Sequence, residues 1–317
     1  MHLYNFFPSG ERPRNDARNA VRPRPSSRSA QTQGECFMTA SLSASQLTMF
    51  QRCAEQWRRR HLEEELLPPT LPVHTGRAVR EAVHLALRRR METGLPMPPE
   101  DVADAAATAY ARSLRGGVYM PPDDLPSARA ALAAGRDTVV ALTALFCREL
   151  APKLRPALAG HRVELDLGLA LPVAVTIDCL TVDGELHHLP TASRRWSTER
   201  LHGSAVVVLA REAVRRRERG LCPPGFVDVL VGARTPVLQT LEAPCSPDEI
   251  VVLTRKFRLM LTAVQAGIFP PAAPESWNCS PRWCGYFYSC PHVPAFRKRL
   301  PAALHGVLAG CGSAFAV

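Results

Sequence analysis

Lysine is almost absent from this 317-residue chain. Only three of its 39 basic residues are lysines, Lys153, Lys256 and Lys298, and all the others are arginines. Such a skew, beside abundant alanine and proline, is typical of a GC-rich genome, so each arginine is weaker evidence of a binding role than usual. The formal net charge of +10 is compatible with a nucleic-acid partner, because clustered cations gain affinity by releasing counterions from phosphates. It does not establish one.

Long apolar runs and a secretory leader are also missing. No uninterrupted apolar stretch reaches the roughly eighteen residues that a membrane-spanning helix needs, and residues 1–34 lack the compact apolar segment of a signal peptide. We therefore expect a cytoplasmic protein with no membrane partner. In that compartment the ten cysteines are expected to stay reduced unless a metal holds them.

The composition changes near residue 37. Residues 1–37 are rich in Arg, Pro, Ser and Asn, lack a periodic apolar pattern, and carry six arginines against three acids. Such a segment cannot bury enough apolar surface to offset its ordering entropy, so we expect a disordered basic arm. Residues 38–317 are predicted to form a single domain, with a helical insertion at about 95–160 and a cysteine-containing loop at 277–291.

Apolar periodicity predicts helices first and strands later. The expected helices are 43–57, 76–91, 102–114 and 125–158, then 198–219 and a last helix from a capping box at Ser246 to about Gly267. The expected strands are 163–171, 172–182, 185–193, 226–231 and 237–241, with a hairpin turn at Asp183-Gly184. This order predicts an α/β (α+β) fold, a mixed central β-sheet with flanking helices.

Three cysteines close together near the C-terminus are the strongest local signal. Cys279, Cys284 and Cys290 lie five and six positions apart in a turn-rich stretch, and Cys53 on the first helix is the candidate fourth ligand. Thiolates are soft ligands that suit an iron–sulfur cluster or zinc. The spacing favours a [4Fe-4S] cluster, with a zinc site and plain thiols as alternatives. The other six cysteines are scattered and indicate no site.

These features resemble the RecB/AddB-like branch of the PD-(D/E)XK nuclease superfamily. Bacterial, phage and CRISPR-associated members of this branch carry one cysteine before the nuclease core and three after it. The resemblance covers about residues 41–291. Besides the cysteines, it rests on four stretches: Ser43-Ala44-Ser45-Gln46-Leu47 continuing to Trp57, Gly76-Arg77-Ala78-Val79, Val175-Thr176-Ile177-Asp178, and Asp183-Gly184 followed by Thr191-Ala192-Ser193. It implies a restriction-endonuclease-like sheet and action on DNA.

Carrying over the family's catalytic residues leaves most of the metal site unmatched. Asp178 matches the first aspartate, but the helix histidine falls on Arg80, and the acid-x-Lys pair falls on His188 and Pro190. No acid-x-Lys tripeptide exists in the chain. Proline supplies no cation, and an arginine repels a divalent cation. The resemblance therefore implies a nuclease-fold protein whose metal site is eroded and whose enzymatic activity is left open.

A relocated site is the alternative. One predicted hairpin gathers Asp178, Asp183, Glu185, His187 and His188, and Glu185 and His187 share a strand face. Asp178 and Glu185 are the candidate ligands for Mg²⁺ or Mn²⁺, with His188 and Lys256 as further catalytic candidates. Such a site predicts an active metal-dependent DNA exonuclease.

Four arginines are the candidates for contacts with a nucleic-acid backbone, Arg194, Arg195, Arg211 and Arg215. DNA is the expected partner, together with a protein partner of a repair, recombination, phage or CRISPR-type complex. A scaffold held by zinc or a cluster, without nucleic-acid affinity, is the third hypothesis. An arginine-rich helix face is also common as a plain solvated surface.

Overall fold

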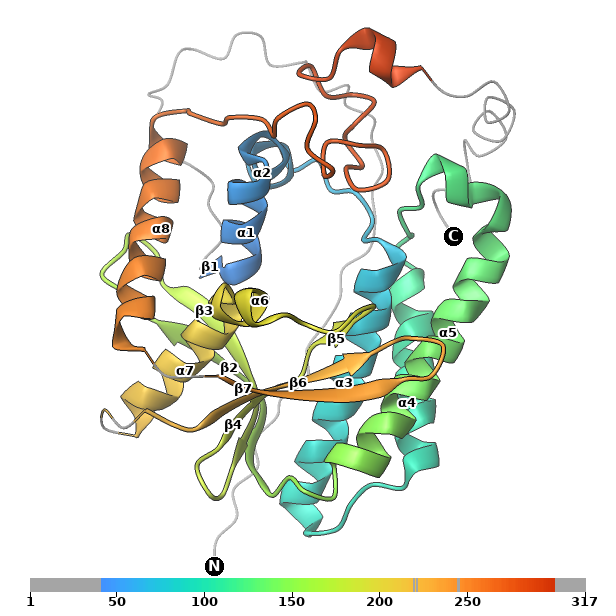
Figure 1. The fold of residues 1–317 in the computed structure, drawn as a ribbon, viewed down its shortest axis with the longest axis vertical. Coiled ribbons are helices and arrows are strands. Elements are labelled where there is room, and N and C mark those ends of the chain that lie inside the picture. Colours follow the sequence, from blue (N-terminus) through green and yellow to red (C-terminus); the bar gives the residue numbers. More distant parts are fainter. Residues whose placement is uncertain (1–40, 219, 221, 244–245, 300–317) are drawn as a thin grey trace, which may run out of the picture. The chain divides into compact units, whose positions relative to one another are not determined.

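A seven-stranded mixed β-sheet flanked by helices forms the centre of the structure over the described residues (Figure 1). The computed structural model describes residues 41–299 except 219, 221, 244 and 245. These residues belong to one compact unit, Cys36–Val317. The predicted fold class is confirmed, whereas the predicted basic arm at 1–37 lies outside the described residues.

The strands of the sheet pair partly in parallel and partly antiparallel. They are β1 (Leu42–Ser43), β2 (Pro156–Leu165), β3 (Val173–Thr181), β4 (Leu186–His188), β5 (Thr191–Ala192), β6 (Gly225–Val231) and β7 (Val237–Ala243). β3 pairs with β1 in parallel and with β2 and β4 antiparallel; β6 pairs with β4 and β5 in parallel and with β7 antiparallel. The sheet thus places β3 and β6 on either side of the short strand β4.

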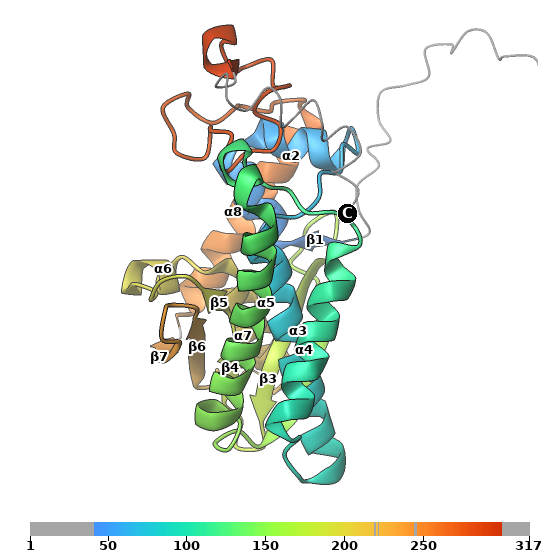
Figure 2. The ribbon, with the colours of Figure 1, turned by 90° about the vertical axis from the view of Figure 1, so that its right-hand side faces the viewer.

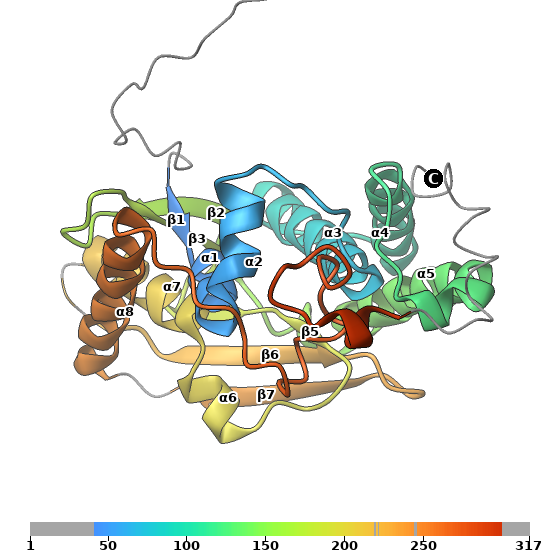
Figure 3. The ribbon, with the colours of Figure 1, turned by 90° about the horizontal axis from the view of Figure 1, so that it is seen from above.

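The helices pack on the sheet in two groups. They are α1 (Ala44–Arg52), α2 (Ala54–His61), α3 (Leu71–Thr93), α4 (Pro99–Leu114), α5 (Ala128–Leu145), α6 (Thr198–His202), α7 (Ala205–Arg217) and α8 (Pro247–Gln265). One hydrophobic cluster joins α1, α7 and α8 to β3, and Figure 3 shows these elements from above. A second joins α3, α4 and α5, which run side by side in Figure 2.

Single residues explain where the elements differ from expectation. Cys53 has extended backbone and splits the first predicted helix into α1 and α2. Pro190 lacks an N–H and separates β4 from β5, so the predicted strand 185–193 is two short strands. The predicted helix 198–219 is likewise divided, between α6 and α7, at Gly203 and Ser204.

Two capping predictions have different outcomes. Ser43 forms a complete capping box with Gln46 at the start of α1. Ser246 is the N-cap residue of α8 with Pro247 at the first turn, but its side chain makes no cap hydrogen bond, so the box predicted there is wrong. The turn at Asp183-Gly184 is confirmed, with Gly184 at φ +81° and its N–H bonded to the Thr181 carbonyl.

The helical insertion ends earlier than expected. It contains α4, a 3₁₀ turn (Pro122–Ser127), α5 and a π-helical turn (Phe146–Leu150), and β2 begins at Pro156, inside the segment predicted as helix. Among the described residues, the stretch Pro122–Leu150 is long and apolar enough to span a membrane by length and composition alone, which is weak evidence. Its residues Val139, Leu142 and Phe146 are buried in the cluster with α3 and α4.

Candidate functional site

Asp178 of β3 is the most tightly held carboxylate of the described residues. Its side chain is fully buried. Oδ1 lies 2.9 Å from His84 Nε2 and 3.4 Å from Arg80 Nε. Oδ2 lies 2.6 Å from His188 Nδ1 and accepts the backbone N–H of Leu189 at 3.0 Å. An ionised carboxylate offers about four acceptor positions; three of them take hydrogen bonds here, and the Arg80 guanidinium adds an ion pair.

Helix α3 carries two of these partners, and strand β2 packs against one of them. Arg80 and His84 are four residues apart on α3, so they lie on one helix face. The ring of His84 lies over Gly160 of β2, where a Cβ would come within 2.6 Å of His84 Nδ1. Gly160 also has φ +58°, a backbone conformation that favours glycine. Glycine therefore suits this position both by its backbone angle and by leaving room for the His84 ring.

Electrostatics keep Asp178 ionised. Burial acts to raise its pKa, but the charge and hydrogen bond of His188, the hydrogen bond of His84 and the charge of Arg80 hold the pKa well below its ordinary value. The facing nitrogens of His84 and His188 therefore donate to it.

The other predicted residues of the metal site lie elsewhere. Glu185 is partly exposed, and its Oε2 is 3.6 Å from His187 Nε2, which confirms that these two side chains share a side of the strand. Lys256 is exposed on α8 and lines a cavity with Gln51 and Ser204. That cavity does not include Asp178, so the structure does not bring Lys256 to the carboxylate.

A second buried His–Asp pair lies on β4 and β6. His187 Nδ1 is 2.7 Å from Asp228 Oδ2, and Thr240 Oγ1 donates to Asp228 Oδ1 at 2.6 Å. The His187 ring stacks on Phe226, and its buried Nε2 has no hydrogen-bond partner among the described residues. Among the described residues, no group of three or more His, Cys, Asp or Glu side chains is arranged to hold a metal ion.

Sequence reasoning missed His84 and Asp228. His84 lies one helical turn beyond Arg80, where the family's histidine was expected, and its side chain reaches the same carboxylate. Asp228 was visible as a single acid inside the apolar strand Gly225–Val231, a pattern that indicates a buried polar contact.

The segment after α8 returns to the neighbourhood of α2 (Figure 1), and the charges of Cys53, Cys279 and Cys290 act on Cys284. The Asn278 side chain donates to the Arg52 carbonyl at 3.1 Å, and the Ala272 N–H points to Cys53 Sγ at 3.4 Å. Turns fix the loop, with the N–H groups of Cys284 and Cys290 bonded to backbone carbonyls at 2.8 Å.

The four thiols affect one another electrostatically. Burial, together with the charges of Cys53, Cys290 and Cys279, raises the pKa of Cys284 to about 11. Four thiolates would suit a thiolate-bound metal centre, which releases protons as it forms, but among the described residues no three of these side chains are arranged to hold a metal ion. If this centre is a [4Fe-4S] cluster, these four cysteines would hold it.

Aromatic side chains around the cysteine loop are divided by burial. Tyr286 and Phe287 are buried within the loop, as expected for shielding of a centre. Trp277 and Trp283 are exposed and contact each other edge to face at 5.5 Å.

Of the remaining cysteines, Cys179 is buried and carries a free thiol. Cys222 is disulfide-bonded, so the expectation that every thiol outside a metal site stays reduced is wrong for it. Cys36, Cys245 and Cys311 lie outside the described residues.

The four predicted backbone-binding arginines are in different environments. Arg194 and Arg195 are exposed after β5. Arg211 is buried and donates to the Ala243 carbonyl at 2.5 Å, so its predicted contact with nucleic acid is wrong. Arg215 lines a groove of about 580 Å³ between α7 and α8.

That groove is basic. Its charged lining comprises Arg215, Arg216, Arg255 and Arg258 against Asp166 and Glu212. Glu212 is already paired with Arg215 and Arg216 at 2.7 Å. Arg255 and Arg258 are exposed at its wall on α8.

No family model and no curated protein matches the chain. A crystal structure named "Putative exonuclease", from Eubacterium rectale, is similar to it at 10% sequence identity and a TM-score of 0.47. The match covers 86% of this chain and 94% of that one. A likeness at this level assigns no function.

Proposed function

We propose that this protein is a DNA-binding member of the RecB/AddB-like branch of the PD-(D/E)XK superfamily that carries a [4Fe-4S] cluster and does not hydrolyse DNA. The observation that carries the proposal is the occupied carboxylate of Asp178. Both of its oxygens are used by His84, Arg80, His188 and the Leu189 amide, and one of these partners is a permanent cation.

A metal-dependent nuclease instead needs carboxylate oxygens that are free to bind a divalent cation. A divalent cation lowers the pKa of a water and neutralises charge at the scissile phosphate, and it must bind carboxylate oxygens to stay in place. At Asp178 the Arg80 guanidinium lies where such a cation would compete for Oδ1. Pro190, at the position of the family's lysine, has no side-chain cation to position water.

Several positions of the family pattern come together around this carboxylate, which supports the assignment. Gly76 of α3 packs so closely on β5 that a Cβ would come within 2.8 Å of Thr191 Oγ1. Arg80, at the position of the helix histidine, and His188, at the position of the second acid, both reach Asp178. The family positions are thus neighbours in space, although two of them hold different side chains.

The basic groove between α7 and α8 supports DNA as the partner. Its lining carries four arginines and two acids, and the chain as a whole has a net charge of +10. Guanidinium groups bind phosphate oxygens in bidentate geometry, which gives affinity without sequence preference.

A cleavage assay tests the proposal. Linear single- and double-stranded DNA are incubated with anaerobically purified full-length protein and either Mg²⁺ or Mn²⁺. We expect both substrates to stay intact under every condition. Cleavage by the wild type that disappears in Asp178→Asn would contradict the closed site, and cleavage lost in Glu185→Gln or Lys256→Ala would favour a relocated one.

A second experiment changes the partners of Asp178 so that its carboxylate can bind a metal ion. In Arg80→His/His188→Asp the competing guanidinium is removed and a second carboxylate is added beside Asp178. We expect this variant to bind Mn²⁺, measured as loss of the free-ion signal in an electron paramagnetic resonance titration, while the wild type does not. The control is the same pair of substitutions with Asp178→Asn, which is expected to lose the binding.

Binding of fluorescent DNA at low salt separates the proposal from a scaffold role. Phosphate contacts are strongest there, so a protein that does not bind DNA at low salt would be the scaffold of the third hypothesis.

A further inference from the structure

Two exposed tryptophans contact each other on the cysteine loop. The rings of Trp277 and Trp283 are 5.5 Å apart at an angle of 90°, and the residues are 62% and 53% exposed. The other two tryptophans of the chain are placed differently: Trp57 is 2% exposed and stacks on Phe269, and Trp196 is half-buried. Tryptophan has a large apolar area to bury, so two of them exposed together indicate a contact surface.

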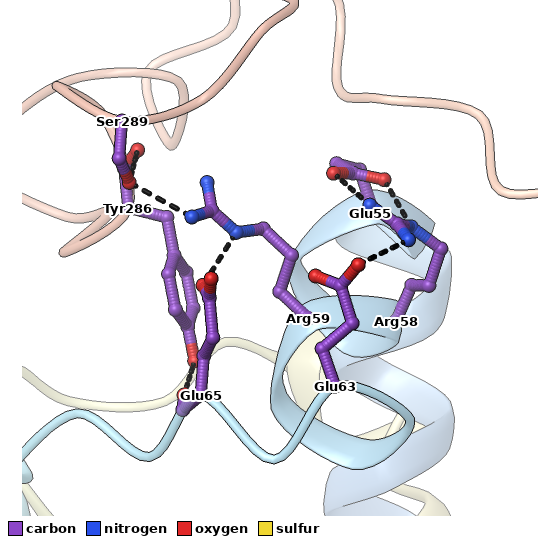
Figure 4. A network of polar contacts seen from close by, with 7 residues as sticks. All are labelled: Glu55, Arg58, Arg59, Glu63, Glu65, Tyr286 and Ser289. Atoms are coloured by element: carbon purple, nitrogen blue, oxygen red, sulfur yellow. Dashed lines mark hydrogen bonds and ion pairs between the residues drawn. The ribbon is translucent and has the colours of Figure 1, made fainter. Parts of the chain in front are cut away.

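The loop that carries this pair is fixed to α2 (Figure 4). Arg59 of α2 is buried; its Nε is 2.7 Å from Glu65 Oε2, and its Nη2 donates to Ser289 Oγ at 2.9 Å. Its guanidinium also lies 4.8 Å from the centre of the Tyr286 ring, whose hydroxyl donates to the Glu65 carbonyl. A loop held in this way loses little conformational entropy when a ligand binds to it.

Backbone contacts fix the two tryptophans relative to each other. The Trp283 N–H bonds to the Ser280 carbonyl at 3.1 Å, and the Ser280 hydroxyl donates to the Trp277 carbonyl at 2.8 Å. The Asn278 side chain ties the same turn to the Arg52 carbonyl at 3.1 Å. The two rings are therefore presented together on a turn that is attached to the end of α1.

The surroundings of the pair are basic. Arg282 is exposed, and its guanidinium lies 6.0 Å from the centre of the Trp283 ring. Its Nη1 is 3.9 Å from Asp124 Oδ1, at the limit of an ion pair. Residues 268–299 carry one acid, Glu275, and four cations, Arg282, Arg297, Lys298 and Arg299. Aromatic faces beside a cation match a nucleotide, whose base stacks and whose phosphate is an anion.

We propose that Trp277 and Trp283 form a stacking platform for unpaired bases of single-stranded DNA, with Arg282 contacting a neighbouring phosphate. This inference rests on the DNA binding in the proposed function and adds the form of DNA that the loop takes. In an edge-to-face pair the partner covers only one face of one ring, so faces remain for a base. Every base has a π-face, so such stacking tolerates any sequence. The bases of a duplex are already stacked on one another.

The test compares a labelled oligo-dT strand with a labelled duplex of the same length, by fluorescence anisotropy with the full-length protein over a salt series. Trp277→Ala/Trp283→Ala removes both rings, and Trp277→Phe/Trp283→Phe keeps an aromatic face at each position. The matched control is Met91→Ala/Leu95→Ala, which removes two other exposed apolar side chains, 40% and 69% exposed. A circular dichroism spectrum of every variant checks the fold.

We expect the alanine variant to bind oligo-dT at least about tenfold more weakly and the duplex within about twofold of the wild type. Its slope of log K against log salt should not change, because no phosphate contact is removed, whereas Arg282→Gln should lower the slope for oligo-dT by about 0.7. The phenylalanine variant should lie between wild type and the alanine variant, and the control should equal the wild type.

Intrinsic fluorescence gives a second readout. A base stacked on an indole quenches its fluorescence, so oligo-dT should quench the wild type. The alanine variant keeps Trp57 and Trp196, and we expect its fluorescence to stay unquenched. Quenching that is equal in the two proteins would place the bound strand away from the loop.

Three results would overturn the inference, and they differ in meaning. Unchanged affinity of the alanine variant for oligo-dT removes the platform while DNA binding stands, and leaves a protein contact as the role of the pair. Equal losses for oligo-dT and duplex show that the pair does not select unpaired bases. A wild type that binds neither form removes the proposed DNA binding as well. If the alanine variant does not fold, Trp283→Ala alone is judged by the same comparison.

Discussion

A single buried carboxylate, Asp178, organises the side chains between α3 and the sheet. Its partners come from the helix and from β4, so the ion pairs tie elements that are far apart in sequence. Removing one partner of a buried charge network usually lowers the free energy of unfolding by more than the intact network adds to it, because the other charges stay buried and unpaired.

Asp178→Asn tests this at the residue scale. We expect the free energy of unfolding to fall by about 3–5 kcal/mol, measured by urea denaturation with circular dichroism. Asp183→Asn is the control, because Asp183 pairs with Arg155 on the exposed turn, where the loss should stay below about 1 kcal/mol. Equal losses in the two variants would show that the buried contacts do not stabilise the fold.

The same carboxylate predicts a pH dependence. The pKa of Asp178 is lower in the folded protein than its ordinary value of 3.8. Its contribution to stability is therefore fully present above that value and is lost as the pH falls below it towards the folded pKa. The stability gap between wild type and Asp178→Asn should narrow as the pH falls below about 4.

At the scale of elements, the contact between α3 and β2 depends on a glycine. Gly160 and Gly168 both have positive φ, but a Cβ at Gly160 meets His84 at 2.6 Å, whereas a Cβ at Gly168 meets nothing within 4 Å. We expect Gly168→Ala to cost about 1 kcal/mol for the backbone alone and Gly160→Ala to cost about 1–3 kcal/mol more because it displaces the His84 ring. Thermal and urea unfolding measure both, and similar losses would contradict the close packing of α3 on β2.

Elements with a regular pattern could be predicted from the sequence, and irregular ones could not. The apolar period of α3 and α8 and the alternation in β3 gave the right element types. The first three residues of β2 were predicted as helix, because Leu154 and Leu158 are four residues apart, and Gly160 interrupts any alternation further along the strand. Breaks at Cys53 and Gly203 depend on packing that a local pattern does not record.

The candidate site was predictable only in part, for the same reason. Asp178 and the cysteine frame stand out as motifs, and in the structure the charges of Cys53, Cys279 and Cys290 act on Cys284. His84 and Asp228 act through contacts between distant segments, and the burial of Arg211 depends on the Ala243 carbonyl and Glu249. Arginine-rich sequence therefore does not indicate which guanidinium groups are free to bind a partner.

At the scale of the whole molecule, the groove between α7 and α8 predicts where DNA binds. In Arg255→Gln/Arg258→Gln we expect the affinity for DNA at low salt to fall about tenfold and the slope of log K against log salt to decrease by about 1–2. Arg129→Gln/Arg136→Gln on α5 changes the net charge equally and should leave the affinity within about twofold. Fluorescence anisotropy over a salt series measures both, and equal effects would mean that net charge, not the groove, attracts DNA.

The most direct test of the central claim is one anomalous diffraction experiment on anaerobically grown crystals soaked in Mn²⁺. The account predicts iron density among Cys53, Cys279, Cys284 and Cys290, and no manganese at Asp178, whose oxygens remain bonded to His84, Arg80 and His188. Manganese bound to Asp178 with Arg80 turned away, or no metal among the four cysteines, would contradict it.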